Sequence, residues 1–485
     1  MKTTLFFALL LIGQAVYTQE NKITFYPDSA KDIISRHIYG HFSEHLGRCI
    51  YGGFWVDKDS GIPNTGRIRN DVVAALKEIA IPNLRWPGGC FADEYHWMNG
   101  IGPEEDRPSM INTNWGGVTE DNSFGTHEFM RLCQMLDCEP VVCGNVGSGT
   151  VREMSEWVEY LNSDNISPMT NLRKENGREE SFGVRYFGIG NESWGCGGNM
   201  TAEYYSDVLR RYSSFCKNYG KNRLYKIASG PSDSNYHWTE TLMKDWQTRQ
   251  MFQGLSLHYY TRAHTESWSY KGSATDFTTG EWFSTMSNAL RIDTFINRHS
   301  KIMDRYDPGK EIGLIVDEWG NWHDIEPGTN PGFLFQQNTL RDAVSAAVSL
   351  DIFNNHCDRV KMANIAQVIN VLQSVLLTRD NDLVKTPTFY VFKMYKVHHD
   401  ALLIPNSTQS VNYTEGGRSV AAVHSSCSRD DDGRYHITIT NLDPDNALDV
   451  DCEFKGLKKM NVTKGEIITA GQMNALNDFG KEEEV

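Results

Sequence analysis

Apolar and polar positions alternate along the chain in a repeating order, a short apolar run followed by an amphipathic stretch, from about residue 38 to about residue 367. Short apolar runs bounded by turn residues predict buried strands, and a 3.6-residue apolar period predicts helices. The predicted strands are 38–44, 81–86, 141–145, 184–192, 225–230, 255–260, 312–318 and 360–367. The predicted helices between them include 71–80, 126–137, 151–162, 201–220 and 338–353. Thr126 and Thr201 mark two of the expected helix starts, because an acidic residue follows each of them closely.

Eight strands separated by helices predict an α/β fold, a (β/α)8 TIM barrel, over residues 38–396. A doubly wound open sheet would give the same alternation. However, no G-x-G-x-x-G turn follows the first strand to support a dinucleotide site. The barrel is therefore the preferred interpretation.

The pattern changes after about residue 397, where short strand-like runs are separated by DDDG and DPDN turns. These runs are 419–426, 434–441, 447–454 and 464–470. We predict a β-sandwich over residues 397–485. The segment 19–37 contains the run KITFYP, and we expect it to contribute a further strand to that sandwich.

The first 18 residues have the pattern of a signal peptide, with one lysine, an apolar run from Leu5 to Val16, and then small and polar residues. The apolar run is too short to span a bilayer comfortably, and no later segment reaches about 18 uninterrupted apolar residues. We therefore expect an exported protein, periplasmic or extracellular, that is cleaved near Thr18 or Gln19.

The composition is that of a globular protein, with 40% hydrophobic and 22% charged residues in a chain of 485 residues. The formal net charge of −15 argues against nucleic acid or an anionic membrane surface as a partner. The ten cysteines match no metal-binding spacing and no small disulfide scaffold, so mostly buried free thiols are expected. His41, His45 and Cys49 fit no zinc pattern, and we reject a metal site there.

Polar side chains stand at the ends of the predicted strands, where the active site of a (β/α)8 barrel lies. A single such residue would mean little, but packing alone does not explain a polar or aromatic residue at the end of each of the eight strands. These residues are Glu44, Arg85 with Trp86, Asn145, Asn191 with Glu192, Ser229, His258 with Tyr260, Glu318, and Gln367.

Two of the strand ends carry glutamates followed by tryptophan, Glu192 in GIGNESWG and Glu318 in LIVDEWGNW. Cleavage of a glycosidic bond requires one protonated carboxyl group and one carboxylate. A separation of about 5–5.5 Å gives retention and about 6.5–9.5 Å gives inversion of configuration. Alone, Glu192 could be a loop or helix-start acid, and Glu318 could belong to a surface Asp-Glu pair. Their joint position on strand ends favours the catalytic interpretation.

The other strand-end residues have structural alternatives. Asn191 could be a turn residue or a donor to a sugar hydroxyl, and Glu44 could form a salt bridge with Arg48. His258 and Tyr260 could be packed barrel residues. In the functional interpretation, the Tyr260 hydroxyl keeps the nucleophile ionised and oriented.

Five separated motifs in this order resemble family 51 of the glycoside hydrolases, the retaining α-L-arabinofuranosidases. They are LRWPGGCFADEYHW, GNESWGCGG, SLHYYT, DEWGNWH and MANIAQVINVLQS. The resemblance covers about Tyr39 to Asp400 and implies a barrel with a jelly-roll β-sandwich, no metal or cofactor, and double displacement through a covalent arabinosyl-enzyme.

The resemblance also implies the roles of individual residues. Glu192 would be the general acid/base and Glu318 the nucleophile. Family positions that hold the furanose hydroxyls match Glu44, Cys90, Asn191, Tyr260 and Gln367, and those that line the pocket match Trp194 and Trp319. Family members are commonly hexamers and continue for a further strand or two, so we expect a homo-oligomer and a truncated sandwich edge.

The leading hypothesis is thus an exo-acting enzyme that releases terminal arabinofuranose from arabinan, arabinoxylan or derived oligosaccharides. A related retaining glycosidase acting on another pentoside, or an endo-glucanase, is the runner-up, because fold and carboxylate pair do not define the sugar. A sugar-binding protein without activity would need one glutamate to be replaced, and both are present.

Overall fold

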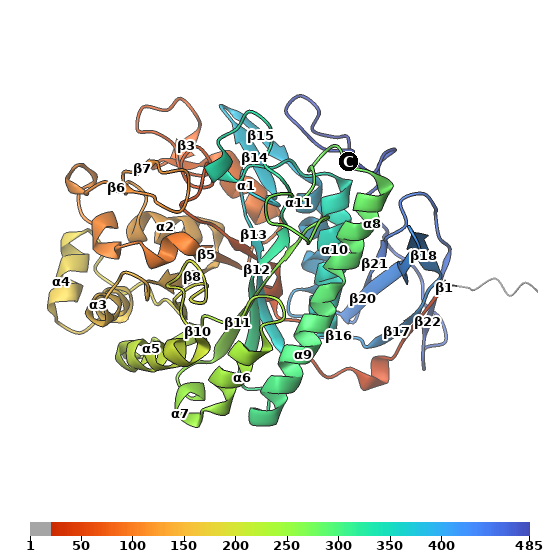
Figure 1. Ribbon diagram of the computed structural model, residues 1–485, viewed down its shortest axis with the longest axis horizontal. Coiled ribbons are helices and arrows are strands. Elements are labelled where there is room, and N and C mark those ends of the chain that lie inside the picture. Colours follow the sequence, from red (N-terminus) through yellow and green to blue (C-terminus); the bar gives the residue numbers. More distant parts are fainter. Residues whose placement is uncertain (1–20) are drawn as a thin grey trace, which may run out of the picture.

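Eight parallel strands close into a barrel in the computed structural model, which describes residues 21–485 (Figure 1). All eight coincide with predicted strands, and the last strand pairs with the first through Ile365 and His41. The predicted signal peptide lies outside the described residues. In order around the barrel the strands are β2 (Gly40–Phe42), β5 (Asn83–Trp86), β8 (Glu139–Gly144), β9 (Tyr186–Ile189), β10 (Tyr225–Ala228), β11 (Gly254–Thr261), β12 (Gly313–Asn321) and β13 (Val360–Ala366).

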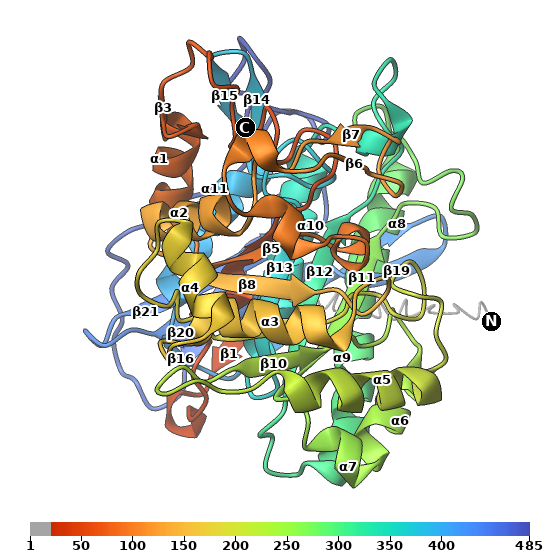
Figure 2. The ribbon, with the colours of Figure 1, turned by 90° about the vertical axis from the view of Figure 1, so that its left-hand side faces the viewer.

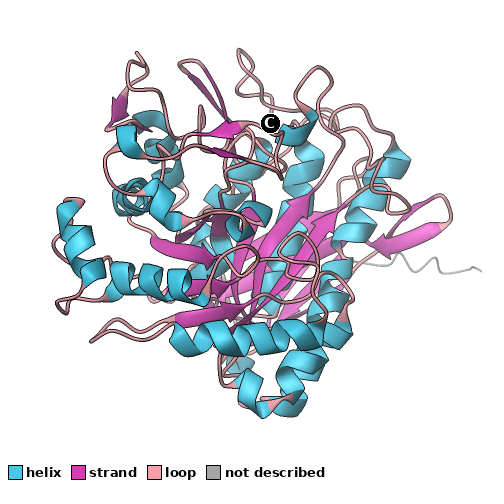
Figure 3. Cartoon of the chain, turned by 60° about the vertical axis from the view of Figure 1, so that its left-hand side comes forward, coloured by secondary structure: helices cyan, strands magenta, loops and turns pink. Residues whose placement is uncertain are grey.

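Helices surround the strands, as Figure 3 shows by colour and Figure 2 shows with α3 and α5 in front of the barrel. The apolar faces of these helices pack on strands that are buried on both sides, which explains why the strands are continuous apolar runs. The helices are α1 (Asn70–Glu78), α2 (Thr126–Leu136), α3 (Val151–Asn162), α4 (Pro168–Glu175), α5 (Ala202–Phe215), α6 (Tyr236–Lys244), α7 (Trp246–Arg249), α8 (Thr279–Ala289), α9 (Arg291–Tyr306), α10 (Leu340–Asn355) and α11 (Pro387–Tyr395). Among residues 21–485, no helix combines the length and the apolarity needed to cross a membrane.

Helix starts test the capping prediction. Thr201 is the N-cap of α5, and its hydroxyl accepts a hydrogen bond from the Tyr204 N–H at 3.2 Å. At α2 the prediction is wrong by one residue, because Gly125 is the N-cap and Thr126 is already helical. The Glu128 carboxylate there accepts from the Gly125 N–H at 2.9 Å, so the acidic residue caps the helix in place of a hydroxyl.

Three short hairpins extend from the carboxyl ends of β2, β5 and β13, on the side of the barrel where a site is expected. They are β3 (Asn64–Thr65) with β4 (Ile68–Arg69), β6 (Met110–Ile111) with β7 (Thr119–Glu120), and β14 (Leu376–Arg379) with β15 (Asp382–Lys385).

The C-terminal unit consists of two three-stranded sheets that pack together, seen at the right of Figure 1. The N-terminal strand β1 lies at the centre of one sheet, antiparallel to β17 and parallel to β22, which confirms that the N-terminus completes the sandwich. A small core of Ile23, Phe25, Ile404, Val423 and Cys427 joins the sheets. The strands are β1 (Asn21–Phe25), β17 (Asn406–Gln409) and β22 (Val450–Phe454), then β16 (Leu402–Leu403), β20 (Val423–Arg429) and β21 (Tyr435–Asn441), with a hairpin of β18 (Asn412–Glu415) and β19 (Arg418–Ala421).

The predicted strand at 464–470 does not form, and this segment is irregular. Its alternating residues are mostly exposed, with Ile467 81% exposed. Residues 466–470 instead line a groove of about 600 Å³ with β21, α10 and α11. An alternating pattern predicts a strand only where a sheet edge pairs with it, and 464–470 pairs with no strand among the described residues.

A buried carboxylate joins the barrel to the sandwich. Asp351 on α10 accepts hydrogen bonds from the hydroxyls of Ser426 at 2.8 Å, Thr438 at 2.7 Å and Thr440 at 3.0 Å on the sandwich strands. Tyr395 on α11 donates to it at 3.1 Å. Burial raises the pKa of Asp351 to about 6, although these hydroxyl donors act in the opposite direction.

Replacement of this carboxyl group by an amide, Asp351→Asn, is expected to change how stability depends on pH. The folded-state pKa exceeds the unfolded value of about 4, so the contribution of Asp351 to the free energy of unfolding falls as the pH rises from about 4 to about 6. The variant has no such titration. Its Tm minus that of the wild type should therefore be more positive at pH 7 than at pH 4, as measured by calorimetry.

Asp451→Asn, at an exposed position of β22 away from the junction between barrel and sandwich, is the matched control for the loss of one carboxyl group. A Tm difference for Asp351→Asn that is the same at pH 4 and pH 7 would contradict the assignment of this titration to Asp351.

Candidate active site

Glu192 lies in a turn directly after β9 and has a left-handed backbone conformation, with φ at 39°. Such a conformation is costly for a residue other than glycine and persists only where its surroundings hold it. Here the Glu192 carbonyl accepts from the N–H groups of Gly195 at 2.7 Å and Gly197 at 3.2 Å. Gly197 cannot be larger, because a Cβ there would lie 1.8 Å from the Asn191 carbonyl oxygen. The glycines after Glu192 thus form the turn that presents its side chain.

Glu318 on β12 is buried and fully engaged. Arg85 Nη1 on β5 donates to Oε1 at 2.8 Å, and the Tyr260 hydroxyl on β11 donates to Oε2 at 2.9 Å. Two donors, one of them cationic, suit a carboxylate that must stay ionised and correctly oriented. The predicted contact of Tyr260 with this glutamate is therefore present.

Glu192 and Glu318 face each other across the mouth of the barrel, with a carboxylate oxygen of one within 4.8 Å of a carboxylate oxygen of the other. The Glu192 side chain remains 17% exposed, so a ligand can reach it. Burial and the neighbouring Glu318 raise the pKa of Glu192, although His258 acts in the opposite direction. A carboxyl group with a raised pKa that lies close to a second carboxyl group held by two donors suits nucleophilic displacement with general acid assistance.

His258 on β11 bridges two carboxyl groups, with Nδ1 2.8 Å from Glu192 Oε1 and Nε2 3.1 Å from Asp317 Oδ1. Burial alone would lower the pKa of this imidazole, but Glu318, Asp317 and the hydrogen bonds raise the pKa of His258 to about 10. His258 is therefore an imidazolium at neutral pH. Together with Arg85 it balances the charges of Asp317 and Glu318, and its lowering effect on the pKa of Glu192 is outweighed by burial and by Glu318.

A ring of polar groups lies beside the two glutamates. Glu44 Oε1 accepts from the N–H groups of Gly89 and Phe91 at 3.0 Å each, and Glu44 Oε2 accepts from Gln367 Nε2 at 3.1 Å. Burial, together with Glu318, raises the pKa of Glu44 to about 7. The alternative of a Glu44–Arg48 salt bridge is not found among residues 21–485, because Glu44 binds these backbone groups and Gln367 instead.

Two atoms in this ring are buried without a hydrogen-bond partner among the described residues, Asn191 Nδ2 and Gln367 Oε1. The other end of the Asn191 amide is held, because its Oδ1 accepts from Arg85 Nη2 at 2.5 Å. Buried polar groups normally have partners, so one free donor and one free acceptor beside the glutamates mark places for ligand hydroxyls.

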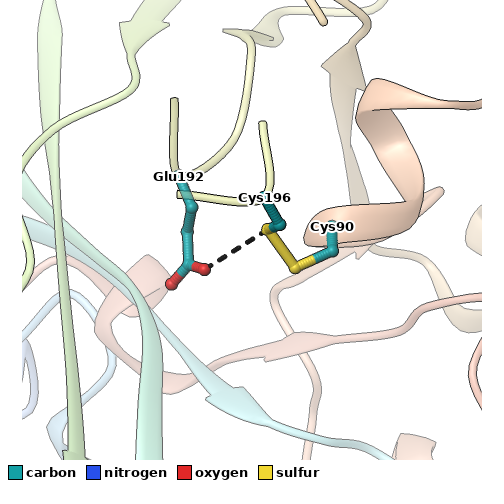
Figure 4. Close-up of side chains that lie close together, drawn as sticks. All are labelled: Cys90, Glu192 and Cys196. Atoms are coloured by element: carbon teal, nitrogen blue, oxygen red, sulfur yellow. Dashed lines mark hydrogen bonds between the residues drawn. A yellow bond between two sulfur atoms is a disulfide. The ribbon is translucent and has the colours of Figure 1, made fainter. Parts of the chain in front are cut away.

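A disulfide between Cys90 and Cys196 borders Glu192, as Figure 4 shows. Cys196 Sγ lies 3.5 Å from Glu192 Oε2, a van der Waals contact, because a disulfide sulfur has no proton to donate. The bond ties the turn after β9 to the loop after β5. The expectation of mostly free thiols is confirmed, since eight cysteines are free and six of these are buried.

The two tryptophans expected in the pocket differ in position. Trp194 is half-buried on the turn that carries Glu192, and its Nε1 donates to the Gly230 carbonyl at 3.1 Å. Trp319 does not line the pocket. It packs behind the barrel against Phe353 of α10 and Phe392 of α11, because adjacent strand residues point to opposite faces and Glu318 takes the inner one.

The remaining strand-end residues, Asn145, Ser229 and Trp86, have structural contacts. Asn145 Oδ1 accepts from the N–H groups of Ser148 and Gly149, and the Ser229 hydroxyl accepts from the Ser193 N–H. Trp86 is fully buried in the core. These residues hold loops or pack, which is the structural alternative to a binding role.

Sequence reasoning missed three residues that contact the site. Asp317 pairs with His258, and Trp115 Nε1 donates to Glu44 Oε1 at 2.9 Å. Trp322 packs edge-on against Tyr260 with ring centroids 5.0 Å apart. Asp317 and Trp322 belong to the DEWGNW motif that contains Glu318, so this motif could have identified them. Trp115 comes from a loop with no distinguishing pattern.

Two groups of side chains have metal-ligand atoms within 4.8 Å of one another: Cys90, Glu192 and Cys196, and Glu192, His258 and Glu318. Neither suits a metal. The cysteine sulfurs are bonded to each other, and the protonated His258 has no free lone pair. His41 and His45 have other contacts, with Phe392 at 4.6 Å between ring centroids and with Trp86 Nε1 at 3.0 Å.

Comparison with known proteins gives the same assignment for both halves of the chain. Residues 75–273 match the model of the α-L-arabinofuranosidase 1 domain, and residues 317–485 match the α-L-arabinofuranosidase C-terminal domain. An intracellular exo-α-L-arabinofuranosidase of Bacteroides ovatus is 52% identical over 99% of this chain and 93% of its own length.

Solved structures agree in fold. The GH51 arabinofuranosidase of Xanthomonas axonopodis pv. citri is 47% identical with a TM-score of 0.93, and the α-L-arabinofuranosidase of Thermotoga maritima, in an arabinose complex, is 28% identical with a TM-score of 0.82. In both comparisons 96% of this chain and 94% of the other are covered.

The prediction of an exported protein is wrong, and the comparison with the Bacteroides ovatus relative gives the reason. The Bacteroides ovatus relative, which matches 99% of this chain, is named as an intracellular enzyme. The prediction depended on a single lysine followed by a short apolar run, a pattern with little information. It falls within residues that the structure does not describe.

The disulfide predicts a thiol count. Denatured, unreduced protein should titrate eight thiols with a chromogenic disulfide reagent, because two of the ten cysteines are bonded to each other. Cys196→Ser should titrate nine, since Cys90 then loses its partner, whereas the control Cys452→Ser at an exposed free cysteine should titrate seven. Ten thiols in the unreduced wild type would show that the bond does not form.

Proposed function

The chain belongs to family 51 of the glycoside hydrolases, and we propose that it is an exo-acting, retaining α-L-arabinofuranosidase in which Glu192 is the general acid/base and Glu318 the nucleophile. The observation that supports the proposal most directly is the distance between these side chains, with carboxylate oxygens within 4.8 Å. A pair of carboxylate oxygens this close favours the shorter carboxyl separation of retaining enzymes, roughly 5–5.5 Å, over the roughly 6.5–9.5 Å of inverting enzymes.

In the first step Glu318 attacks the anomeric carbon of a terminal arabinofuranosyl unit. The bond between that carbon and the glycosidic oxygen breaks, and Glu192 transfers its proton to the departing oxygen. Arg85 and Tyr260 orient Glu318 through their hydrogen bonds to separate oxygens. The products are a free alcohol on the rest of the saccharide and an ester between arabinose and Glu318.

In the second step Glu192, now a carboxylate, takes a proton from a water molecule that attacks the anomeric carbon. The ester bond breaks, Glu318 regains its charge, and Glu192 regains its proton. Two displacements on the same carbon restore the original configuration. Water enters from the side that the leaving group vacated, where Glu192 is 17% exposed.

Substrate hydroxyls are proposed to bind the ring formed by Glu44, Asn191 and Gln367. Asn191 Nδ2 is a free donor and Gln367 Oε1 a free acceptor, so both can bind a furanose hydroxyl without giving up an existing bond. Cys90, the other residue expected to hold a furanose hydroxyl, offers a disulfide sulfur rather than a thiol.

Arabinan, arabinoxylan and oligosaccharides derived from them are the proposed substrates. The proposal also includes a homo-oligomer, with a hexamer as the specific expectation. Sedimentation analysis of the full chain tests the oligomer independently of the activity.

Replacement of each glutamate tests the two roles separately on 4-nitrophenyl α-L-arabinofuranoside. Glu318→Ala should have no detectable turnover, because no ester can form. Glu192→Ala should lose about 10²–10⁴-fold on arabino-oligosaccharides, whose leaving group needs a proton. Azide should rescue Glu192→Ala on the nitrophenyl substrate and give an arabinosyl azide opposite in anomeric configuration to the arabinosyl-enzyme.

Glu453→Ala, at an exposed ion pair on β22, serves as the control and should keep full activity. Cleavage of a xyloside or glucan but not of the arabinofuranoside would contradict the substrate and leave the mechanism in place. Azide rescue of Glu318→Ala instead of Glu192→Ala would reverse the two roles.

The charge on His258 predicts a shift in the pH profile. His258→Gln keeps a hydrogen-bonding side chain but removes the imidazolium, which acts to lower the pKa of Glu192. The pKa of Glu192 should therefore rise, and the alkaline limb of kcat/KM should move to higher pH. His237→Gln, which removes an exposed histidine paired with Glu203, is the control. An unmoved limb, or one at lower pH, would contradict a charged His258.

A further inference from the structure

Asp93 is a buried carboxyl group beside the candidate active site that has no part in the mechanism above. It is 5% exposed and ends the short 3₁₀ helix Cys90–Asp93, which follows β5. Burial of a carboxyl group is costly unless its oxygens accept hydrogen bonds. Asp93 therefore needs donors, and the donors that it has come from two other loops of the site.

Both oxygens of the Asp93 side chain accept from backbone N–H groups at the ends of barrel strands. Oδ1 accepts from Val146 at 2.7 Å and from Gly147 at 2.9 Å, in the loop after β8. Oδ2 accepts from Asn191 at 2.9 Å, in the turn after β9 that carries Glu192. One side chain thus joins the ends of three neighbouring strands, β5, β8 and β9.

The helix that carries Asp93 holds this turn on both sides of Glu192. Asp93 binds the N–H of Asn191, directly before Glu192. Cys90, at the start of the same helix, is bonded to Cys196, shortly after Glu192 (Figure 4). The segment that presents the glutamate is therefore fixed at its entry by a hydrogen bond and at its exit by a covalent bond.

The left-handed backbone of Glu192 makes the hydrogen bond at the entry important. This conformation, with φ at 39°, persists only while its surroundings hold it. The N–H groups of Gly195 and Gly197 hold the Glu192 carbonyl, and Asp93 holds the backbone on the preceding side. Gly197 also packs on Asp93, since a Cβ at Gly197 would lie 2.6 Å from Asp93 Oδ2. The direction of the Glu192 side chain thus depends on a carboxyl group outside the reacting pair.

We propose that Asp93 is a positioning residue for the general acid/base, which it orients through the turn after β9. This rests on the proposed function, since it assumes that Glu192 transfers the protons. Asp93 touches neither the substrate nor the reacting atoms. Its effect is confined to the proton-transfer side of the site, because Glu318 is oriented by Arg85 and Tyr260 instead.

Asp93→Asn tests the proposal with almost no change in shape. A carboxyl group accepts through both oxygens, whereas an amide has one oxygen and one NH2 group. In either orientation the NH2 group faces another donor, either the N–H of Asn191 or those of Val146 and Gly147. The turn must then shift, and a displacement of about 1 Å in a catalytic group costs up to roughly 100-fold in rate.

The expected loss depends on how much proton transfer a substrate needs. On an α-1,5-linked arabinotriose, whose leaving oxygen must be protonated, kcat/KM of Asp93→Asn should fall about 10–100-fold. On 4-nitrophenyl α-L-arabinofuranoside, whose leaving group departs without a proton, kcat/KM should remain within about threefold. Azide should raise kcat of the variant on the nitrophenyl substrate, because azide attacks the arabinosyl-enzyme without a general base.

Asp351→Asn is the matched control, because it replaces another buried, hydrogen-bonded carboxyl group, at the junction with the sandwich. It should keep the wild-type ratio of kcat/KM between the two substrates and should not respond to azide. Asp93→Ser is a second variant, in which a shorter side chain also loses the paired oxygens, and it should show the same selective loss. Circular dichroism identifies any variant that does not fold.

A selective loss on arabinotriose together with activation by azide, in either Asp93 variant, supports the proposal. Equal losses on both substrates without an azide response would overturn it, and so would unchanged kinetics. Failure of both variants to fold would overturn it as well, since Asp93 would then serve the fold rather than the orientation of Glu192. A wild type inactive on both substrates, or a Glu192→Ala variant that azide does not rescue, would instead contradict the proposed function.

Discussion

The buried ion pair between Arg85 and Glu318 is the interaction on which the rest of the site depends. Arg85 has its Nη1 on Glu318 and its Nη2 on the Asn191 amide, while its Nε lies 3.6 Å from Asp317. One guanidinium therefore orients Glu318, the proposed nucleophile, together with the Asn191 amide and Asp317, the partner of His258. Removal of one member of a buried pair typically costs about 3–5 kcal/mol, because the other charge remains without compensation. Such a charge network persists only inside a rigid frame.

The barrel is that frame, and its register decides which side chains meet. Glu318 and His258 are Cα partners on neighbouring strands β12 and β11, and Tyr260 follows two residues later on the same inner face. The sandwich adds rigidity from outside, since Asp351 on α10 bonds hydroxyls of both β20 and β21. α10 follows β12 in the chain, so this junction supports the helical layer behind the strand that carries Glu318.

Strand ends were predictable from the sequence because buried parallel strands are continuous apolar runs, and polar residues at their ends are conspicuous. Glu192, Glu318, Tyr260 and Gln367 were identified in this way. Two failures have definite physical causes. Asp317 was missed because strict alternation turns it away from the site, whereas β12 is irregular there and lets both Asp317 and Glu318 reach His258. Trp319 was misplaced because a neighbouring position in a motif does not tell which face of a strand it occupies.

The network also accounts for the two proposed roles of Glu192, first as an acid and then as a base. Glu318 and burial raise the pKa of Glu192, whereas His258 lowers it. In the proposed mechanism Glu318 becomes a neutral ester, so its contribution to the pKa of Glu192 disappears while that of the His258 imidazolium remains. The pKa of Glu192 must then fall, and the group that has just given up its proton is stabilised as the carboxylate that activates water. Formation of the proposed ester thus removes the charge of Glu318, which is one of the two causes that raise the pKa of Glu192. No movement of the backbone is needed, which is consistent with a Glu192 turn held by two hydrogen bonds and bordered by a disulfide.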